Sequence, residues 1–139
     1  MTEEKKDFFV SDISLSYQYT AGNATTRFLN KVAEGKLVAQ KCPKCSAVYV
    51  PPRGSCPRCG VATEEELELP DTGAVESFTI VHIPIPGNPI VPPYVSAMIR
   101  LDGADISFLH LIQEIDLADI RIGMRVQAVW KDKSDWGTT

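Results

Sequence analysis

The chain lacks any group of residues that is typical of a catalytic centre. Its 139 residues include only two histidines, His82 and His110, both within segments that the pattern predicts to be strands. An isolated histidine in a strand is more often a hydrogen-bonded structural residue than a base. The sequence has no nucleophile elbow, no glycine-rich phosphate loop and no pair of histidines on one helix face. We therefore expect a binding or assembly module that is not an enzyme on its own.

Long apolar runs and an excess of positive charge are lacking too. No run approaches the roughly 20 apolar residues that cross a bilayer. The start of the chain, "MTEEKKDFF", is not followed by the apolar core of a signal peptide. These features predict a cytoplasmic protein with no membrane partner. The formal net charge of −4 also argues against a chain-wide surface for nucleic acid.

Cysteine is absent outside one short segment, "KCPKCSAVYVPPRGSCPRCG". This segment holds two Cys-x-x-Cys pairs, made by Cys42, Cys45, Cys56 and Cys59. A tight turn in each pair brings two thiolates onto one metal ion, and two pairs complete the tetrahedral shell of a Zn²⁺. Such a shell leaves no position for water or substrate. The spacing therefore predicts one structural zinc per chain, held in a zinc ribbon.

Two other interpretations of the cysteines stay open from the residues alone. Iron in the same four-sulfur shell would make an electron carrier. The segment "CPRCG" is similar to a rubredoxin knuckle, but the gap between the two pairs is much shorter than in rubredoxin. Thiol–disulfide exchange would use a single Cys-x-x-Cys pair at a helix N-terminus. Two matched pairs favour a metal site over both.

The rest of the pattern is mainly β, preceded by one helix. "NATTRFLNKVAEGK" has an apolar stripe at helical spacing, with Asn23 or Thr25 as its cap and Gly35 at its end. "LVAQK" predicts a short strand that leads into the first cysteine pair. From Gly73 onward the apolar period changes to two. This predicts strands in "GAVESFTIVHIP", "YVSAMIRL", "DISFLHLI" and "GMRVQAVWK".

Four or five short strands in this length suit a small closed barrel of the OB type, with a small sandwich as the main alternative. The alternation in "YVSAMIRL" predicts one buried face, made by Val95, Ala97, Ile99 and Leu101. The predicted organisation is an extended arm over residues 1–22, a helix plus zinc ribbon over 23–70, an OB-fold barrel over 71–132 and a tail over 133–139.

Two segments outside the predicted strands are candidates for contact with a partner. The arm holds Phe8, Phe9, Tyr17 and Tyr19, and we expect it to lie either on a partner or on its own domain. The proline loop, "IPIPGNPIVPPY" (residues 83–94), is expected to be stiff and extended because five prolines fix φ and remove donors. In OB-folds this loop is one of those that contact ligands. A rigid connector with no ligand is the alternative.

Charge is unevenly placed around the cysteines. Residues 41–60 contain no acid and four basic side chains, those of Lys41, Lys44, Arg53 and Arg58. An acidic stretch, "TEEELELPD", follows directly, and we interpret it as a solvated face. The positive charge is therefore local to the cysteine segment.

These motifs occur in a fixed order that resembles a known family. "RFLNKVAEGKLVAQKCPKC" leads into "VYVPPRGSCPRCG", and then come "TGAVESFTIVHIP", "VPPYVSAMIRLDG" and "IGMRVQAVW". Over about residues 17–131 the chain is similar to the acyl-CoA-associated OB-fold proteins with a rubredoxin-like zinc ribbon, the domain of unknown function number thirty-five. These proteins are small partners of thiolase-type enzymes, of steroid side-chain aldolases and of the benzoylsuccinyl-CoA thiolase.

The resemblance implies a non-catalytic, zinc-containing subunit that docks on a thiolase-like catalytic subunit in a hetero-oligomer and helps to shape or cover its acyl-CoA site. The reaction would form or thiolytically cleave a C–C bond. The four basic residues could meet the phosphates of a coenzyme A thioester or an acidic partner surface, or they are simply solvated. The proline loop, through Pro84, Pro86, Pro92 and Pro93, could line an apolar channel. A nucleic-acid-binding zinc-ribbon/OB module is the alternative function.

Overall fold

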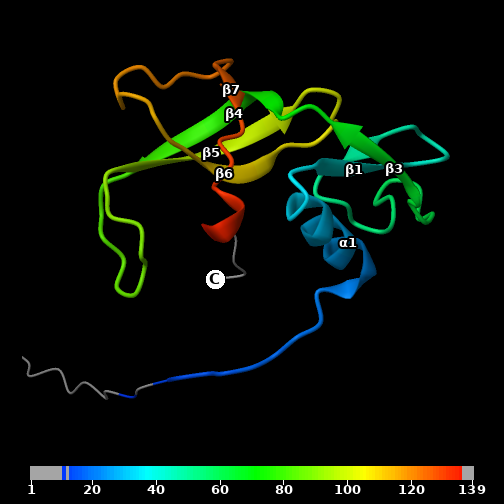
Figure 1. Cartoon of the computed structure of the whole chain (residues 1–139), viewed down its shortest axis with the longest axis horizontal. Helices are drawn as coiled ribbons and strands as arrows, with labels where there is room; N and C mark the ends of the chain where they lie inside the picture. The colour runs from blue at the N-terminus through cyan, green and yellow to red at the C-terminus, as the bar shows by residue number, and fades with distance from the viewer. Residues whose placement is uncertain (1–10, 12, 136–139) are drawn as a thin grey trace, which may run out of the picture.

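The computed structural model describes residues 11 and 13–135 (Figure 1). Expectations about Phe8, Phe9 and residues 136–139 lie outside the described residues. The described chain is mainly β with one N-terminal helix, as the sequence predicts. Its elements are α1 (Gly22–Val32), β1 (Leu37–Lys41), β2 (Val48–Tyr49), β3 (Glu65–Leu69), β4 (Thr72–Val81), β5 (Tyr94–Leu101), β6 (Phe108–Ile112), β7 (Arg125–Gln127) and the 3₁₀ turn η1 (Lys133–Asp135).

The first sheet carries the metal ribbon and has the strand order β2-β1-β3. Helix α1 lies beside β1 and β3 (Figure 1) and packs Phe28 against the core. Its predicted end is confirmed, because Gly35 has a left-handed φ of 77° just beyond the last turn. Its predicted cap is wrong. The N-cap residue is Ala21, which forms no side-chain cap, so neither Asn23 nor Thr25 starts the helix.

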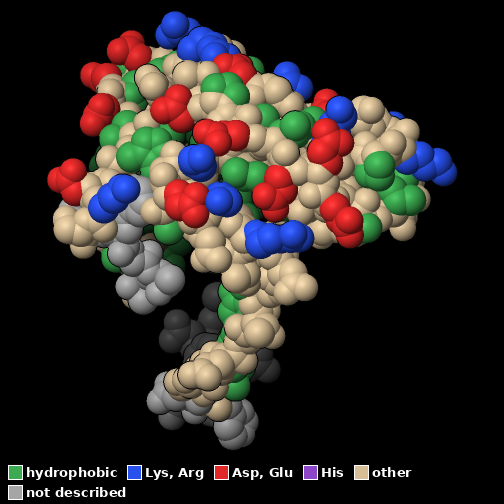
Figure 2. All heavy atoms as spheres, turned by 45° about the vertical axis from the view of Figure 1, so that its right-hand side comes forward, with side chains coloured by type: hydrophobic (Ala, Val, Ile, Leu, Met, Phe, Trp, Pro, Cys, Tyr) green, Lys and Arg blue, Asp and Glu red, His purple; other side chains and the backbone are tan. Residues whose placement is uncertain are grey.

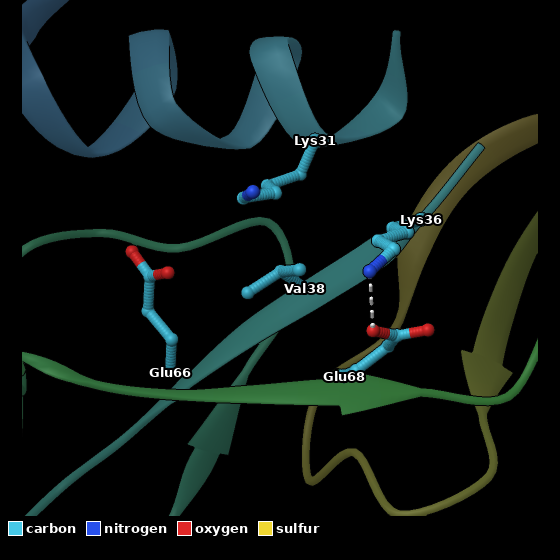
Figure 3. A pocket seen from close by; sticks show the side chains of 5 residues that line it. All are labelled: Lys31, Lys36, Val38, Glu66 and Glu68. Carbon is cyan, nitrogen blue, oxygen red and sulfur yellow. Dashed lines mark ion pairs between the residues drawn. The ribbon is translucent and has the colours of Figure 1, made fainter. Parts of the chain in front are cut away.

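Strand β3 was not predicted, because its sequence is rich in glutamate, which strands disfavour. It pairs antiparallel with β1, and Leu67 and Leu69 pack against the core. The glutamates of residues 64–68 are exposed, so the predicted solvated face is confirmed. Basic and acidic side chains lie close together on this side of the molecule (Figure 2). In the groove between α1 and β3, Lys36 lies 3.4 Å from Glu68 (Figure 3).

The second sheet has the strand order β6-β5-β4-β7, with all pairs antiparallel. The predicted alternation in β5 is confirmed: the buried residues are Val95, Ala97, Ile99 and Leu101. The hairpin from β5 to β6 turns at Gly103, which has a φ of 87°. Strand β7 is shorter than the predicted segment of residues 123–131.

Strands β4 and β5 approach each other closely at Gly73. A Cβ placed on Gly73 would lie 2.5 Å from the carbonyl oxygen of Arg100 and 3.1 Å from Cα of Leu101. Both of these atoms belong to the backbone of β5, opposite Gly73 in the register. Only glycine therefore allows the two strands to pair at this point.

The two sheets share one hydrophobic core. Ala39 and Val48 of the ribbon sheet belong to the same buried cluster as Val75 and Val95 of the second sheet. A pair of hydrogen bonds also joins them, because the Val48 N–H donates to the Asp105 carboxylate at 2.8 Å and the Asp105 N–H donates to the Val48 carbonyl at 3.0 Å. The fold of the ribbon and that of the second sheet are therefore coupled.

Asp102 joins three strands at one edge of the second sheet. Its carboxylate accepts a bidentate pair of hydrogen bonds from Arg125 in β7, one of them at 2.7 Å, and another from the Thr72 hydroxyl of β4 at 2.6 Å. The bonds from Arg125, and then the bond from Thr72, hold the pKa of Asp102 well below its usual range. The clamp therefore fastens β7 and β4 to the β5–β6 turn while Asp102 is ionised.

We expect Asp102→Asn to lower the midpoint of thermal unfolding at pH 7. Because the pKa of Asp102 is lower in the folded chain than in the unfolded chain, its contribution is present above the unfolded value of about 3.9 and is lost as the pH falls through the folded value. The difference between wild type and variant should therefore shrink as the pH falls below about 4. Thermal unfolding of the wild type and the variant, at pH 7 and again at a pH below about 4, measures this difference. An equal difference in midpoint at the two pH values would contradict the clamp.

Candidate metal centre

The two cysteine pairs fold into matching knuckles. In the first, the Cys42 N–H donates to the Ala47 carbonyl at 2.8 Å, and the Ser46 N–H donates to the Cys42 carbonyl at 2.9 Å. In the second, Cys56 bonds in the same way to Val61 at 2.8 Å and accepts from Gly60 at 2.9 Å. The two knuckles are therefore near copies of one turn.

The position after each pair requires a left-handed backbone. Gly60 has a φ of 66° and Ser46 has a φ of 61°. Gly60 has no side chain to hinder this conformation. Ser46 adopts the same conformation despite its side chain, which L-residues rarely do.

The four sulfurs come together at one point. The Sγ atoms of the four cysteines all lie within 4.8 Å of one another, and those of Cys45 and Cys56 are 3.7 Å apart. Ligands about 2.3 Å from a tetrahedral ion are separated by about 3.8 Å, so this spacing fits a Zn²⁺. Cys42 and Cys56 are buried, while Cys45 is exposed and Cys59 half-buried. The set is closed, with four sulfurs for four positions, which is typical of a structural site.

Backbone and side-chain donors stabilise the thiolates. The N–H groups of Lys44 and Cys45 both point at the sulfur of Cys42, at 3.4 Å. The Tyr49 hydroxyl lies 3.2 Å from the sulfur of Cys56. This hydroxyl is the main reason that the pKa of Cys56 is lowered to about 6, and the same bond is the main reason that the pKa of Tyr49 is raised to about 12.

Cys59 is affected in the opposite direction. Its pKa is raised to about 12, chiefly by its hydrogen bond with Cys45 and then by desolvation. Without an ion, the four thiols cannot all ionise side by side, and one positive ion would remove that conflict. The donor chemistry of the four residues therefore fits a zinc ion. Tyr49 was missed from the sequence, where nothing distinguishes it from an ordinary apolar residue of the ribbon hairpin.

The basic residues of the cysteine segment, residues 41–60, lie on the surface of the ribbon. The side chains of Lys44, Arg53 and Arg58 are exposed, and no ion pair to them is found among the described residues. Lys41 is half-buried, 3.9 Å from Glu65.

The proline loop connects β4 and β5 and projects from the end of the second sheet that points away from the ribbon (Figure 1). Within it, Asn88 donates to the Tyr94 hydroxyl at 3.3 Å and accepts from the Ile90 N–H at 3.0 Å. Its apolar side chains face solvent: Ile83 is 76%, Ile85 57% and Val91 82% exposed. Pro84, Pro86 and Pro93 are exposed and Pro92 is half-buried.

The basic ribbon surface and the proline loop therefore lie at opposite ends of the molecule (Figure 1). They cannot form the two walls of one small site on this chain. Any contact that they make with coenzyme A or with a partner would be two separate contacts.

Two family models match successive parts of the chain. The ChsH2 rubredoxin-like zinc ribbon domain matches residues 30–65, and the ChsH2 C-terminal OB-fold domain matches residues 66–131. The chain is also 37% identical, over 97 residues, to a "DUF35 domain-containing scaffold protein" of Methanocaldococcus jannaschii, covering 68% of this chain and 67% of that protein. The chain belongs to the DUF35 family. The OB-type domain and the rubredoxin-like ribbon are confirmed, and the ribbon model favours zinc over iron.

Three further proteins are similar to the chain. The chain is 34% identical over 95 residues to a "Probable enoyl-CoA hydratase alpha subunit" of Thermomonospora curvata, covering 68% of this chain and 29% of that protein. The crystal structure of a DUF35 protein of unknown function from Sulfolobus solfataricus superposes with a TM-score of 0.63 at 28% identity, covering 77% of this chain and 76% of that one. The "Ltp2-ChsH2(DUF35) aldolase" superposes with a TM-score of 0.68 at 28% identity, covering 84% and 91%.

Among the described residues, no helix of this DUF35 protein is both long and apolar enough to cross a membrane.

Proposed function

We propose that this DUF35 protein is a non-catalytic subunit of an acyl-CoA enzyme. The observation that carries the proposal is the match of both domains to ChsH2 family models. The proteins similar to this chain include a DUF35 scaffold protein, a probable enoyl-CoA hydratase alpha subunit and the Ltp2-ChsH2(DUF35) aldolase. The alignment covers only 29% of that hydratase subunit, so most of that protein is not matched by this chain.

The distribution of reactive groups supports the same proposal. In the part of the chain that the structure describes, the four cysteines are the only cluster with metal-ligand geometry, and a closed zinc shell would leave no free thiolate as nucleophile. His82 and His110 are both exposed. The His110 ring lies 3.2 Å from the carbonyl oxygen of Leu111 and makes an edge contact with the Phe108 ring. Among the residues that the structure describes, neither histidine has the neighbours that a catalytic base requires.

The more specific proposal concerns the partner. We infer that the catalytic subunit belongs to the thiolase superfamily, and that this chain docks on it and covers part of its acyl-CoA site. The proline loop supports this role because it presents exposed apolar side chains on a backbone that is already restricted, so little conformational entropy is lost on contact. The coenzyme A thioester would then lie at the interface between the two subunits.

Isolation of the complex tests the proposal. The tagged full chain is purified from its native cells at moderate salt, and the chains that accompany it are identified by mass spectrometry. A thiolase-like chain in near-equal amount is the expected result. If the chain comes out alone or with RNA, the proposal is wrong. RNA binding with a steep salt dependence would support the nucleic-acid alternative.

A loop variant tests the acyl-CoA contact. Replacing Ile85 and Val91 together by Ser should lower the kcat/KM of the purified complex by about tenfold or more, because two apolar contacts would be lost. The midpoint of thermal unfolding should not change, because both side chains are largely exposed. The control is Gln113→Ser, at an exposed position just after β6. An unchanged kcat/KM in the loop variant would exclude the loop from the acyl-CoA site.

A further inference from the structure

The described part of the arm extends away from the rest of the chain (Figure 1) and has no regular secondary structure from residue 13 to residue 20. Ile13, Leu15, Tyr17 and Tyr19 are 77–83% exposed. The rings of Tyr17 and Tyr19 have centroids 6.3 Å apart, so these two side chains lie on the same side of the backbone. The arm therefore presents a row of large apolar side chains that the described chain does not cover.

These residues alternate strictly with polar ones. Ser14, Ser16, Gln18 and Thr20 occupy the positions between and after them. Alternation of this kind, with aromatic and β-branched residues on one face, is the pattern of a strand with one buried face. In the described part of the chain, however, residues 13–20 pair with no strand. The sequence is that of a half-buried strand without its sheet.

The arm also lacks the features that keep exposed strands apart. Residues 13–20 contain no Lys, Arg, Asp, Glu or Pro, and the uncharged stretch continues to residue 26. Figure 2 shows no acidic or basic side chain along the described arm, in contrast to the body of the molecule. Natural edge strands usually carry charges or prolines that block pairing with other chains. An extended segment without them is suited to pairing with another strand edge.

The edges of this chain's own sheets are poor partners for the arm. Among the described strands, β2 and β7 are edges with only two and three residues, and β3 is an edge lined with glutamates. Longer edges in a second copy are offered by β6, with five residues, and by β4 beyond Val75, where its hydrogen bonds to β7 and the residues before it end. The matched domain models begin at residue 30, so the arm belongs to neither the ribbon nor the OB domain. The position of the arm outside both domains favours a different chain as the partner, and a second copy of this chain is an outcome that the tests below separate.

We propose that residues 13–19 add a β-strand to an unpaired strand edge of the catalytic subunit. Main-chain hydrogen bonds would fix the arm, and the four apolar side chains would be buried on one face of the extended sheet, as in other complexes made by strand addition. This proposal rests on the proposed function, because it takes the catalytic subunit as the partner.

Hydrogen–deuterium exchange on the complex isolated with the tagged full chain tests the pairing. In a strand added to one edge, alternate N–H groups point at the neighbouring strand. Alternate amides of residues 13–19 should therefore exchange at least about a hundredfold more slowly in the complex than in the free chain. In the free chain all of them should exchange as in an unfolded peptide.

Two matched variants test the face that is buried. Leu15→Asp should raise the dissociation constant of the complex by about tenfold or more, because it places a charge in an apolar contact. Ser16→Asp adds the same charge at the neighbouring position on the other face and should change it by less than about threefold. Neither change should affect thermal unfolding of the free chain, since both side chains are exposed. Equal effects of the two variants would overturn the proposal.

The failures are distinguishable. If the complex forms but the arm amides exchange as fast as in the free chain, the strand addition is wrong and the proposed function stands. If the arm amides exchange slowly in the chain alone, and more slowly as more of the chain forms dimers, the partner is a second copy and the proposal is overturned. If no catalytic subunit accompanies the chain, the proposed function and the arm proposal fail together.

Discussion

Replacement of Cys56 by Ser is expected to release the metal, unfold the ribbon and detach the partner subunit. Cys56 is buried, and its sulfur is one of the four that a single ion would hold. Metal binding in such sites contributes directly to folding, so the loss of one thiolate removes much of that contribution. The midpoint of thermal unfolding should fall by about 10 °C or more.

The loss of folded structure should extend beyond the ribbon, because the two sheets share a core. Val48 lies between Ala47 and Tyr49, which pack with the cysteines, and it belongs to the same buried cluster as Val75 and Val95. Its backbone is also tied to Asp105 near the start of β6. Circular dichroism should therefore show that the variant loses structure throughout the chain, and not only in the ribbon.

Metal analysis and pull-down measure this prediction. The wild type should hold about one zinc per chain and the variant much less. Ser55→Ala changes the exposed neighbour of Cys56 and serves as the control, which should keep both zinc and partner. A Cys56→Ser variant that remains fully assembled and active would show that the ribbon is not a structural clip. A red protein that contains iron would show that the ion itself is wrongly assigned.

Replacement of Gly73 by Ala is expected to lower the free energy of unfolding by about 3 kcal/mol. The new Cβ would lie 2.5 Å from the Arg100 carbonyl oxygen, and this atom is part of the backbone of β5. Since no flexible side chain can move aside, β4 and β5 would have to separate where they pair. These two strands form the centre of the second sheet, so the whole domain would be affected.

Urea unfolding of two glycine variants separates this contact from a backbone effect. Gly87, in the proline loop, has a φ of 81°, and a Cβ there would meet nothing within 4 Å. Gly87→Ala should therefore cost only about 1 kcal/mol, which is the strain of a left-handed alanine. If Gly73→Ala cost no more than Gly87→Ala, at an unchanged m-value, the close approach of β4 and β5 would be wrong.

Local patterns in the sequence predicted the features that depend only on residues close together in the chain. Two Cys-x-x-Cys pairs are enough to predict the knuckles, because each turn is made within six residues or fewer. Alternation predicted which face of β5 is buried, and Gly35 predicted the end of α1. In each case the conformation or burial of the residue is set by its near neighbours in the sequence.

Features that depend on distant partners were missed or misplaced. Strand β3 forms because β1 offers it a pairing edge, although its glutamates disfavour strands. The Tyr49 hydroxyl reaches Cys56 only because the ribbon hairpin folds back on the second knuckle. The sequence could not show that the basic ribbon surface and the proline loop lie at opposite ends, since that arrangement is set by how the two sheets share their core. Contacts of either surface with coenzyme A stay predictions, as do the domain boundaries.

In the proposed function, this chain supports catalysis by another subunit without catalysing anything itself. The most direct test is to measure acyl-CoA turnover by the isolated complex, by the catalytic subunit alone and by this zinc-loaded chain alone. We expect turnover by the complex and none by this chain. The catalytic subunit alone should show little or no turnover, and its activity should recover when this chain is added back. Turnover by this chain alone, or a catalytic subunit that is fully active without it, would overturn the proposed function.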